Sequence, residues 1–168
     1  MYRNKIEDRM GERWTTMVKK YVNGEISETT LKVRIRLDFK SEVKNKLFGN
    51  KNLIKAAEEA REQHVALLRN VPFQGVKVED IDLGMEIYVV YDENIGEDVA
   101  YAPVFLTLEA DSFEDVVRFI MRDEFRKIEI IDPQEIFMSK QDAERLLFKT
   151  NTELRSYRNA LDKKYNLR

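Results

Sequence analysis

The sequence predicts a protein of the α+β class, in which one antiparallel sheet packs against helices. The first observation is the run 31–39, where apolar and charged residues alternate without a break. This period of two is typical of a strand with one buried and one exposed face. The second observation is a pair of strand-like runs, 85–92 and 100–109, joined by a turn that contains Asn94 and Gly96. The third is that segments of helical periodicity stand before and after this pair.

An N-terminal helix is expected within residues 1–23. Apolar residues recur at spacings of three and four from Ile6 to Val22, and Asn23-Gly24 is a typical helix stop. After the first strand, Ser41 can cap a short helix that ends near Gly49, and Asn52 can cap a longer one over 53–69.

The rest of the chain continues the alternation of strands and helices. Ser112 and Ser139 stand where each can cap a helix, and Pro133 ends the last strand. The expected elements are an irregular acidic segment at 76–83 that can hold a short extended piece, strands at 85–92 and 100–109, a helix at 112–122, a strand at 126–131 and a long helix at 139–164.

The core between residues 31 and 131 therefore has the order βαββαβ, counting the helices at 41–69 as one connection. This order is that of the ferredoxin-like arrangement, in which both helices cover one face of the sheet. We expect a single domain over 1–168, with a ferredoxin-like core at 31–131 and extra helices at 1–23 and 139–164.

Composition excludes several classes of protein. The 168 residues include no cysteine, so neither a disulfide framework nor a thiolate metal site can form. No segment has the roughly 20 apolar residues that span a bilayer, and no signal-peptide pattern opens the chain. We therefore expect a cytoplasmic protein that does not associate with membranes.

Charge is distributed unevenly along the chain. Residues 71–135 hold 5 Lys or Arg against 17 Asp or Glu, whereas residues 1–50 hold 12 against 7. The basic segments can be ordinary solvated surface, can pack on the acidic middle, or can bind a polyanion.

No pattern in the sequence is typical of an active site. His64 is the only histidine, so a histidine-based triad or a multi-histidine metal site cannot form. We expect no catalytic residues, no metal ligands and no cofactor. Carboxylates are numerous in 79–98, which leaves a small enzyme dependent on a divalent metal as one alternative.

The exposed face of the predicted sheet is the best candidate for a site. The alternation in 31–39 turns three cations away from the core, and the same reasoning turns aromatic residues of 85–92 and 100–109 to that side. Cations interleaved with aromatic rings suit single-stranded nucleic acid, because phosphates pair with the cations and bases stack on the rings. The candidate residues are Lys32, Arg34, Arg36, Tyr88, Tyr101 and Phe105.

Two blocks of the sequence are similar to a known domain. The first is Val33-Arg-Ile-Arg-Leu-Asp-Phe39 with the preceding Ile6–Trp14 segment. The second runs from Phe105-Leu-Thr-Leu-Glu-Ala-Asp111 through Ile128-Glu-Ile-Ile-Asp-Pro133 into a final helix. Together these blocks resemble the WCX domain that closes many bacterial WYL-type transcriptional regulators. The Trp-Tyr-Leu sequence of the WYL domain is absent, so its ligand-binding residues cannot be transferred. The resemblance implies dimerisation and the sensing of an effector, which can be nucleic acid.

The sequence thus favours a non-enzymatic regulatory, effector-binding or oligomerisation module. We expect a homodimer, formed through the heptad-like final helix or the exposed sheet face. Such a module can be part of a transcriptional regulator that binds an anionic ligand such as single-stranded nucleic acid. The alternative is a structural protein-interaction domain without nucleic-acid binding.

Overall fold

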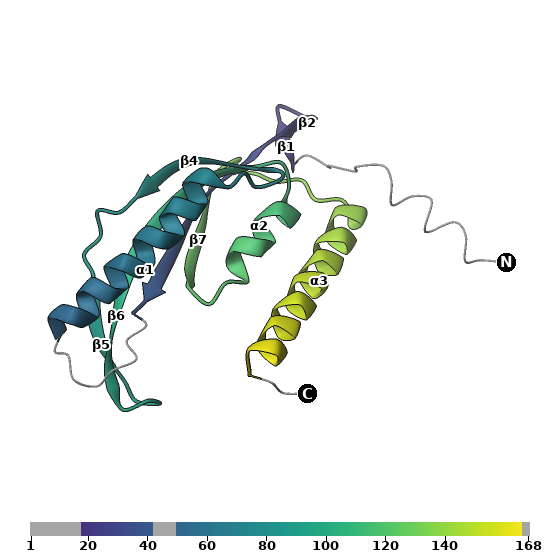
Figure 1. The fold of residues 1–168 in the computed structure, drawn as a ribbon. Helices are drawn as coiled ribbons and strands as arrows, with labels where there is room; N and C mark the ends of the chain where they lie inside the picture. Colours follow the sequence, from purple (N-terminus) through teal and green to yellow (C-terminus); the bar gives the residue numbers. More distant parts are fainter. Residues whose placement is uncertain (1–17, 42–49, 166–168) are drawn as a thin grey trace.

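The computed structural model describes residues 18–41 and 50–165, and it has a mixed α+β architecture (Figure 1). The predicted helix at 42–49 and residues 1–17 of the predicted N-terminal helix lie outside the described residues. The described elements are β1 (Val18–Val22), β2 (Glu25–Thr29), β3 (Leu31–Lys40), α1 (Asn50–Asn70), β4 (Val76–Asp82), β5 (Tyr88–Asp92), β6 (Glu97–Ala110), α2 (Phe113–Ile120), β7 (Phe125–Asp132) and α3 (Lys140–Tyr165).

Five strands of the described residues form one antiparallel sheet, with the order β4-β6-β3-β7. Strand β5 also pairs with β6, antiparallel as predicted, along residues 97–101, whereas β4 pairs with residues 105–110 of the same strand. Strands β1 and β2 form a separate hairpin. The long strand β6 is therefore central and is flanked on one side by two short strands placed end to end.

The core lies between the sheet and the helices α1 and α2. Val33 and Ile35 of β3 are fully buried, as the alternation in the sequence predicts. Val104, Leu106 and Leu108 of β6 are buried as well. Helices α1 and α2 both contribute to the same cluster, so both helices cover one face of the sheet. The cluster includes Leu31, Val33, Ile35, Leu37, Phe39, Val65, Leu68, Val104, Leu106, Leu108, Val116 and Phe119.

Helix α3 packs on α2 instead of covering the sheet (Figure 1). Its start is fixed by a reciprocal cap, in which Asp142 N–H donates to the Ser139 hydroxyl and Ser139 N–H donates to the Asp142 carboxylate, at 3.2 and 2.9 Å. Across the strands of the sheet the helices follow the order α1, α2, α3, and α1 lies over the part of the sheet formed by β4, β5 and β6. Helix α3 and strand β7 are therefore at the same end of the molecule.

Four sequence predictions are wrong in part. Residues 18–22 are strand β1 and not the end of a helix, because Asn23 and Gly24 both have positive φ and form the tight turn of a hairpin with β2. Residues 76–82 form the seven-residue strand β4 instead of an irregular segment with a short extended piece, because pairing with β6 supplies their backbone hydrogen bonds. Asn52 lies inside α1, which begins at Asn50, and β5 begins at Tyr88, three residues later than predicted.

Pro103 stands in the middle of β6, where a proline removes a ladder hydrogen bond. Strands β4 and β5 pair with β6 on either side of residues 102–104 and leave those residues unpaired on that edge. Arg61 of α1 reaches this gap and donates from Nη1 to the carbonyl oxygens of Pro103 and Leu83, both at 3.4 Å. The proline is thus tolerated where the ladder is already interrupted.

Candidate functional site: the open face of the sheet

The face of the sheet opposite α1 and α2, called the open face here, carries all six predicted site residues. Arg36 lies opposite Phe105 in the pairing of β3 with β6, and Arg34 lies opposite Thr107. Tyr88 lies opposite Tyr101 in the pairing of β5 with β6. The period of two along each strand turns these side chains away from the core.

Aromatic rings and guanidinium groups stack along the open face. The Arg34 guanidinium lies 4.5 Å from the centroid of the Phe105 ring, and that of Arg36 lies 5.9 Å from the Tyr88 ring. The rings of Tyr88 and Tyr101 are stacked with their centroids 5.6 Å apart. These contacts form two groups, Arg34 with Phe105 and Arg36 with the two tyrosines, which are neighbours because Arg36 pairs with Phe105 across the strands. Lys32 lies farther along β3.

Each predicted cation of the open face has a carboxylate partner on the same face. Lys32 Nζ lies 2.7 Å from Glu79 Oε2, and Arg34 Nη2 lies 3.3 Å from Asp82 Oδ2. The hydrogen bond and charge of Glu79 raise the pKa of Lys32, and Lys32 in turn lowers the pKa of Glu79. A phosphate that binds here has to compete with these carboxylates, so the electrostatic gain is smaller than the sequence suggests.

Asp38 is the centre of the polar network and is only 1% exposed. It accepts hydrogen bonds from Arg36 Nε and Nη2 at 2.8 and 3.0 Å and from the Tyr88 hydroxyl at 2.6 Å. Arg126 Nε of β7 lies 3.5 Å from the same carboxylate. Burial and the hydrogen bond to Asp38 raise the pKa of Tyr88, so this phenol stays protonated at neutral pH.

The acidic partners and one cation of this face are not apparent from the sequence. Glu79 and Asp82 belong to strand β4, which the acidic composition of its sequence did not predict. Their side chains reach the cations of β3 across the intervening strand β6. Arg126 reaches the open face because the pairing of β3 with β7 shifts register between Arg36 and Leu37. No local pattern in the sequence marks such a shift. Of these residues only Asp38 lies in the alternating run 31–39, whose period of two predicts that its side chain points away from the core.

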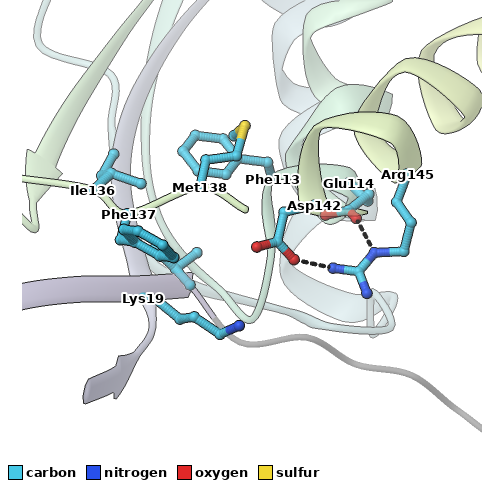
Figure 2. A pocket seen from close by; sticks show the side chains of 9 residues that line it. Lys19, Phe113, Glu114, Ile136, Phe137, Met138, Asp142 and Arg145 are labelled. Atoms are coloured by element: carbon cyan, nitrogen blue, oxygen red, sulfur yellow. Dashed lines mark hydrogen bonds and ion pairs between the residues drawn. The ribbon is translucent and has the colours of Figure 1, made fainter. Parts of the chain in front are cut away.

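One small cavity lies away from the open face, between β1 and the N-terminal ends of α2 and α3 (Figure 2). Its volume of about 20 Å³ has room for a water molecule but not for an organic substrate. Arg145 at its edge pairs with Glu114 at 3.2 Å and with Asp142 at 2.6 Å. These ion pairs therefore link α2 to α3 and stabilise the packing of the two helices.

The acidic segment 79–98 does not assemble a metal site. Among residues 18–41 and 50–165, no group of three or more histidine or acidic side chains is placed to hold a metal ion. Asp92 instead accepts from Asn94 N–H and lies 3.5 Å from Lys40 Nζ, and these hydrogen bonds lower its pKa. In the same described part of the chain, no helix is both long and apolar enough to cross a membrane.

Comparison of the chain with protein-family models, with curated proteins and with solved structures finds no match in any of the three.

Proposed function

We propose that this chain is a non-enzymatic oligomerisation module with a ferredoxin-like core. The order of β5, β6, β3 and β7 across the sheet, with α1 and α2 on one face, supports the ferredoxin-like assignment, and β4 is then an addition beside β6. The module resembles the part of a transcriptional regulator that brings subunits together. Its partner is protein, and in the simplest case a second copy of the chain.

The observation that carries the proposal is a group of large apolar side chains left exposed at the α3 and β7 end. Leu147 and Phe148 of α3 are 71% and 68% exposed. Large apolar side chains that are exposed at one end of a molecule often mark a site of protein contact, since water solvates them poorly. The group consists of Ile128, Ile130, Ile131, Leu147, Phe148 and Leu154.

Heptad spacing on α3 supports the same function. Leu147, Leu154 and Leu161 recur at intervals of seven, which is the spacing of a helix that packs against another helix. Residues on the neighbouring stripe of α3 are partly buried against α2, whereas Leu147 and Leu154 are exposed. A second copy would remove these leucines from water.

The proposal is tested by the oligomeric state of the purified protein and of the variant Leu147→Glu. We expect wild-type protein to dimerise in sedimentation equilibrium. The dissociation constant of the variant dimer should be at least tenfold higher, because burying a leucine is worth about 1.5–3 kcal/mol and each dimer loses two buried leucines. Leu67→Glu on α1 is the matched control, since Leu67 is 58% exposed on a helix at the other end.

Two outcomes would count against this function. Wild-type protein that stays monomeric up to high micromolar concentration would remove it, and so would equal effects of Leu147→Glu and Leu67→Glu. Circular dichroism of both variants establishes that the helices are retained.

A second candidate function is the binding of an anionic ligand, such as single-stranded nucleic acid, on the open face. The stacked groups Arg34, Phe105, Tyr88 and Tyr101 favour it, because bases can extend such a stack for about 1–3 kcal/mol each. Fluorescence anisotropy of labelled single-stranded DNA and RNA at two salt concentrations tests it. Salt-sensitive binding that Arg34→Glu abolishes and Lys55→Glu on α1 leaves intact would support this function, and absence of binding at low salt would end it.

A further inference from the structure

Strand β7 is a bare edge of the sheet within the described residues. It pairs with β3 on one side, and no described strand pairs with its other side. All its residues except Phe125 are exposed. An edge of eight residues with unpaired backbone groups and exposed isoleucines is a template for another strand, and proteins that remain monomeric usually block such an edge.

The opposite edge of the sheet is formed by β4 and by β5, which has only five residues, and β4 is blocked in the usual ways. Strand β4 carries Glu79, Asp80 and Asp82 against Lys77 as its one cation, so two copies of it repel each other. Its pairing with β6 also shifts register in the middle, between Val78 and Asp80, whereas the two shifts in the pairing of β7 with β3 lie on either side of the regular segment 127–130. Strand β7, in contrast, has no net charge, because its two cations, Arg126 and Lys127, are matched by Glu129 and Asp132.

The central residues of β7 are complementary to themselves. Lys127 and Glu129 lie opposite Arg36 and Arg34 in the pairing with β3, so both project from the open face, where they pair with each other. Ile128 lies between them and opposite Ile35, which places it on the face of the helices. In an antiparallel pair of identical strands with its axis at Ile128, each Lys127 stands directly opposite Glu129 of the partner subunit.

We propose that two copies of this chain join their sheets through antiparallel pairing of β7 with β7, with the twofold axis at Ile128. This inference rests on the proposed oligomerisation and names its partner and its contact. The register follows from charge. An axis at Glu129 sets two glutamates against each other and an axis at Lys127 sets two lysines against each other, whereas the axis at Ile128 forms two Lys–Glu pairs.

The position of α3 is consistent with this arrangement. Ile130, 47% exposed, lies opposite Val33 and therefore on the face of the helices, beyond the cover that α2 provides. Helix α3 packs on α2 at the same end of the molecule, with its apolar side chains exposed. Joining the sheets at β7 brings a second sheet and a second helical layer to this end, so one twofold contact covers both apolar groups.

Charge-reversal variants test the pairing directly. In Lys127→Glu the strand carries two glutamates and in Glu129→Lys two lysines, so each variant alone should dissociate about tenfold or more readily than wild type. An equimolar mixture of the two should form a heterodimer, detected by native mass spectrometry. The double variant Lys127→Glu/Glu129→Lys should dimerise like wild type, because reversing both charges restores both pairs.

The matched control is Lys77→Glu, which makes the same change on the other edge strand and should leave dimerisation unchanged. Dimers that survive Lys127→Glu, or single variants that fail to recover on mixing, would overturn the β7 contact and leave the proposed oligomerisation standing. Monomeric wild-type protein would overturn both. If Lys127→Glu failed to fold, the double variant would still decide, since it must dimerise for the inference to hold.

Discussion

The Asp38 carboxylate joins β3, β5 and β7 through its contacts with Arg36, Tyr88 and Arg126. A buried carboxylate is tolerated because two cations and a phenol replace the water that it loses. The same contacts hold the aromatic residues of the open face in position, since Arg126 also lies 5.5 Å from the Tyr101 ring.

Replacing this carboxylate by an amide should leave two cations without their partner. We expect Asp38→Asn to lower the free energy of unfolding by about 1.5–3 kcal/mol, the usual value for hydrogen bonds to charged groups. Urea unfolding should show a lower midpoint with an unchanged slope. Asp80→Asn on the exposed edge of β4 is the control, and equal midpoints for the two variants would contradict the role of Asp38.

Asp142 gives the start of α3 a defined dependence on pH. Burial tends to raise the pKa of this carboxyl, but the hydrogen bonds from the Ser139 hydroxyl and N–H, with Lys19 and Arg145 nearby, lower it overall. A carboxyl with a lowered pKa in the folded state adds stability above its unfolded value of about 3.9, and this is lost as pH falls through the folded pKa.

Asp142→Asn should therefore destabilise the protein at pH 7 by about 1 kcal/mol, as loss of a helix cap usually does. The difference from wild type should shrink as the pH is lowered from 5 to 2. Glu144→Gln on the same helix should show no such convergence, because its pairing with Lys140 is exposed. A constant difference at all pH values would disprove the titration of Asp142.

Among the elements, the turn before β4 depends on a glycine for two reasons. Gly75 has φ of +72°, and a Cβ there would lie 2.5 Å from the Asp115 carboxyl carbon at the start of α2. Its carbonyl also accepts from Asp111 N–H at 2.9 Å. This turn therefore fixes β4 against the beginning of α2.

Gly24 of the β1–β2 hairpin provides a matched comparison, because its φ is +89° but its surroundings are open. Gly24→Ala should cost about 1 kcal/mol for the left-handed backbone alone. Gly75→Ala should cost at least about 1 kcal/mol more, because Asp115 must also move. Thermal unfolding of the two variants measures this difference, and equal melting temperatures would refute the contact with Asp115.

For the whole molecule, stability should depend on protein concentration. Binding that occurs only in the folded state stabilises that state by mass action, so the melting temperature of a dimer rises with concentration. For a chain of this size each kcal/mol corresponds to about 2–4 °C. Scanning calorimetry over a hundredfold range should show such a rise for wild type and none for Lys127→Glu. A constant melting temperature for wild type would contradict assembly.

Strictly periodic segments were the ones that the sequence predicted well. The alternation in β3 assigns Val33, Ile35 and Leu37 to the core, because a strand can bury only one of its faces. Ser112 and Ser139 mark the starts of α2 and α3 for an equally local reason, since a cap involves residues three apart. Such features need no knowledge of distant parts of the chain.

The secondary structure could not be predicted where it depends on pairing with a distant strand, or where one sequence motif is compatible with two structures. Asn23-Gly24 ends helices and also forms hairpin turns, and only the pairing of β1 with β2 distinguishes these. The acidic run at 76–82 has poor strand propensity, and pairing with β6 outweighs it.

The sequence alone established the buried face of β3, the caps of α2 and α3 and the α+β class, because these depend on neighbours along the chain. It also placed the six residues of the open face on one side. The neutralisation of those cations by Asp38, Glu79 and Asp82, the bare edge of β7 and the packing of α3 on α2 emerged only from tertiary structure. Arg34 and Asp82 are 48 residues apart, and Tyr88 and Asp38 are 50 apart. Contacts at such separations depend on strand order and register, which the fold as a whole sets.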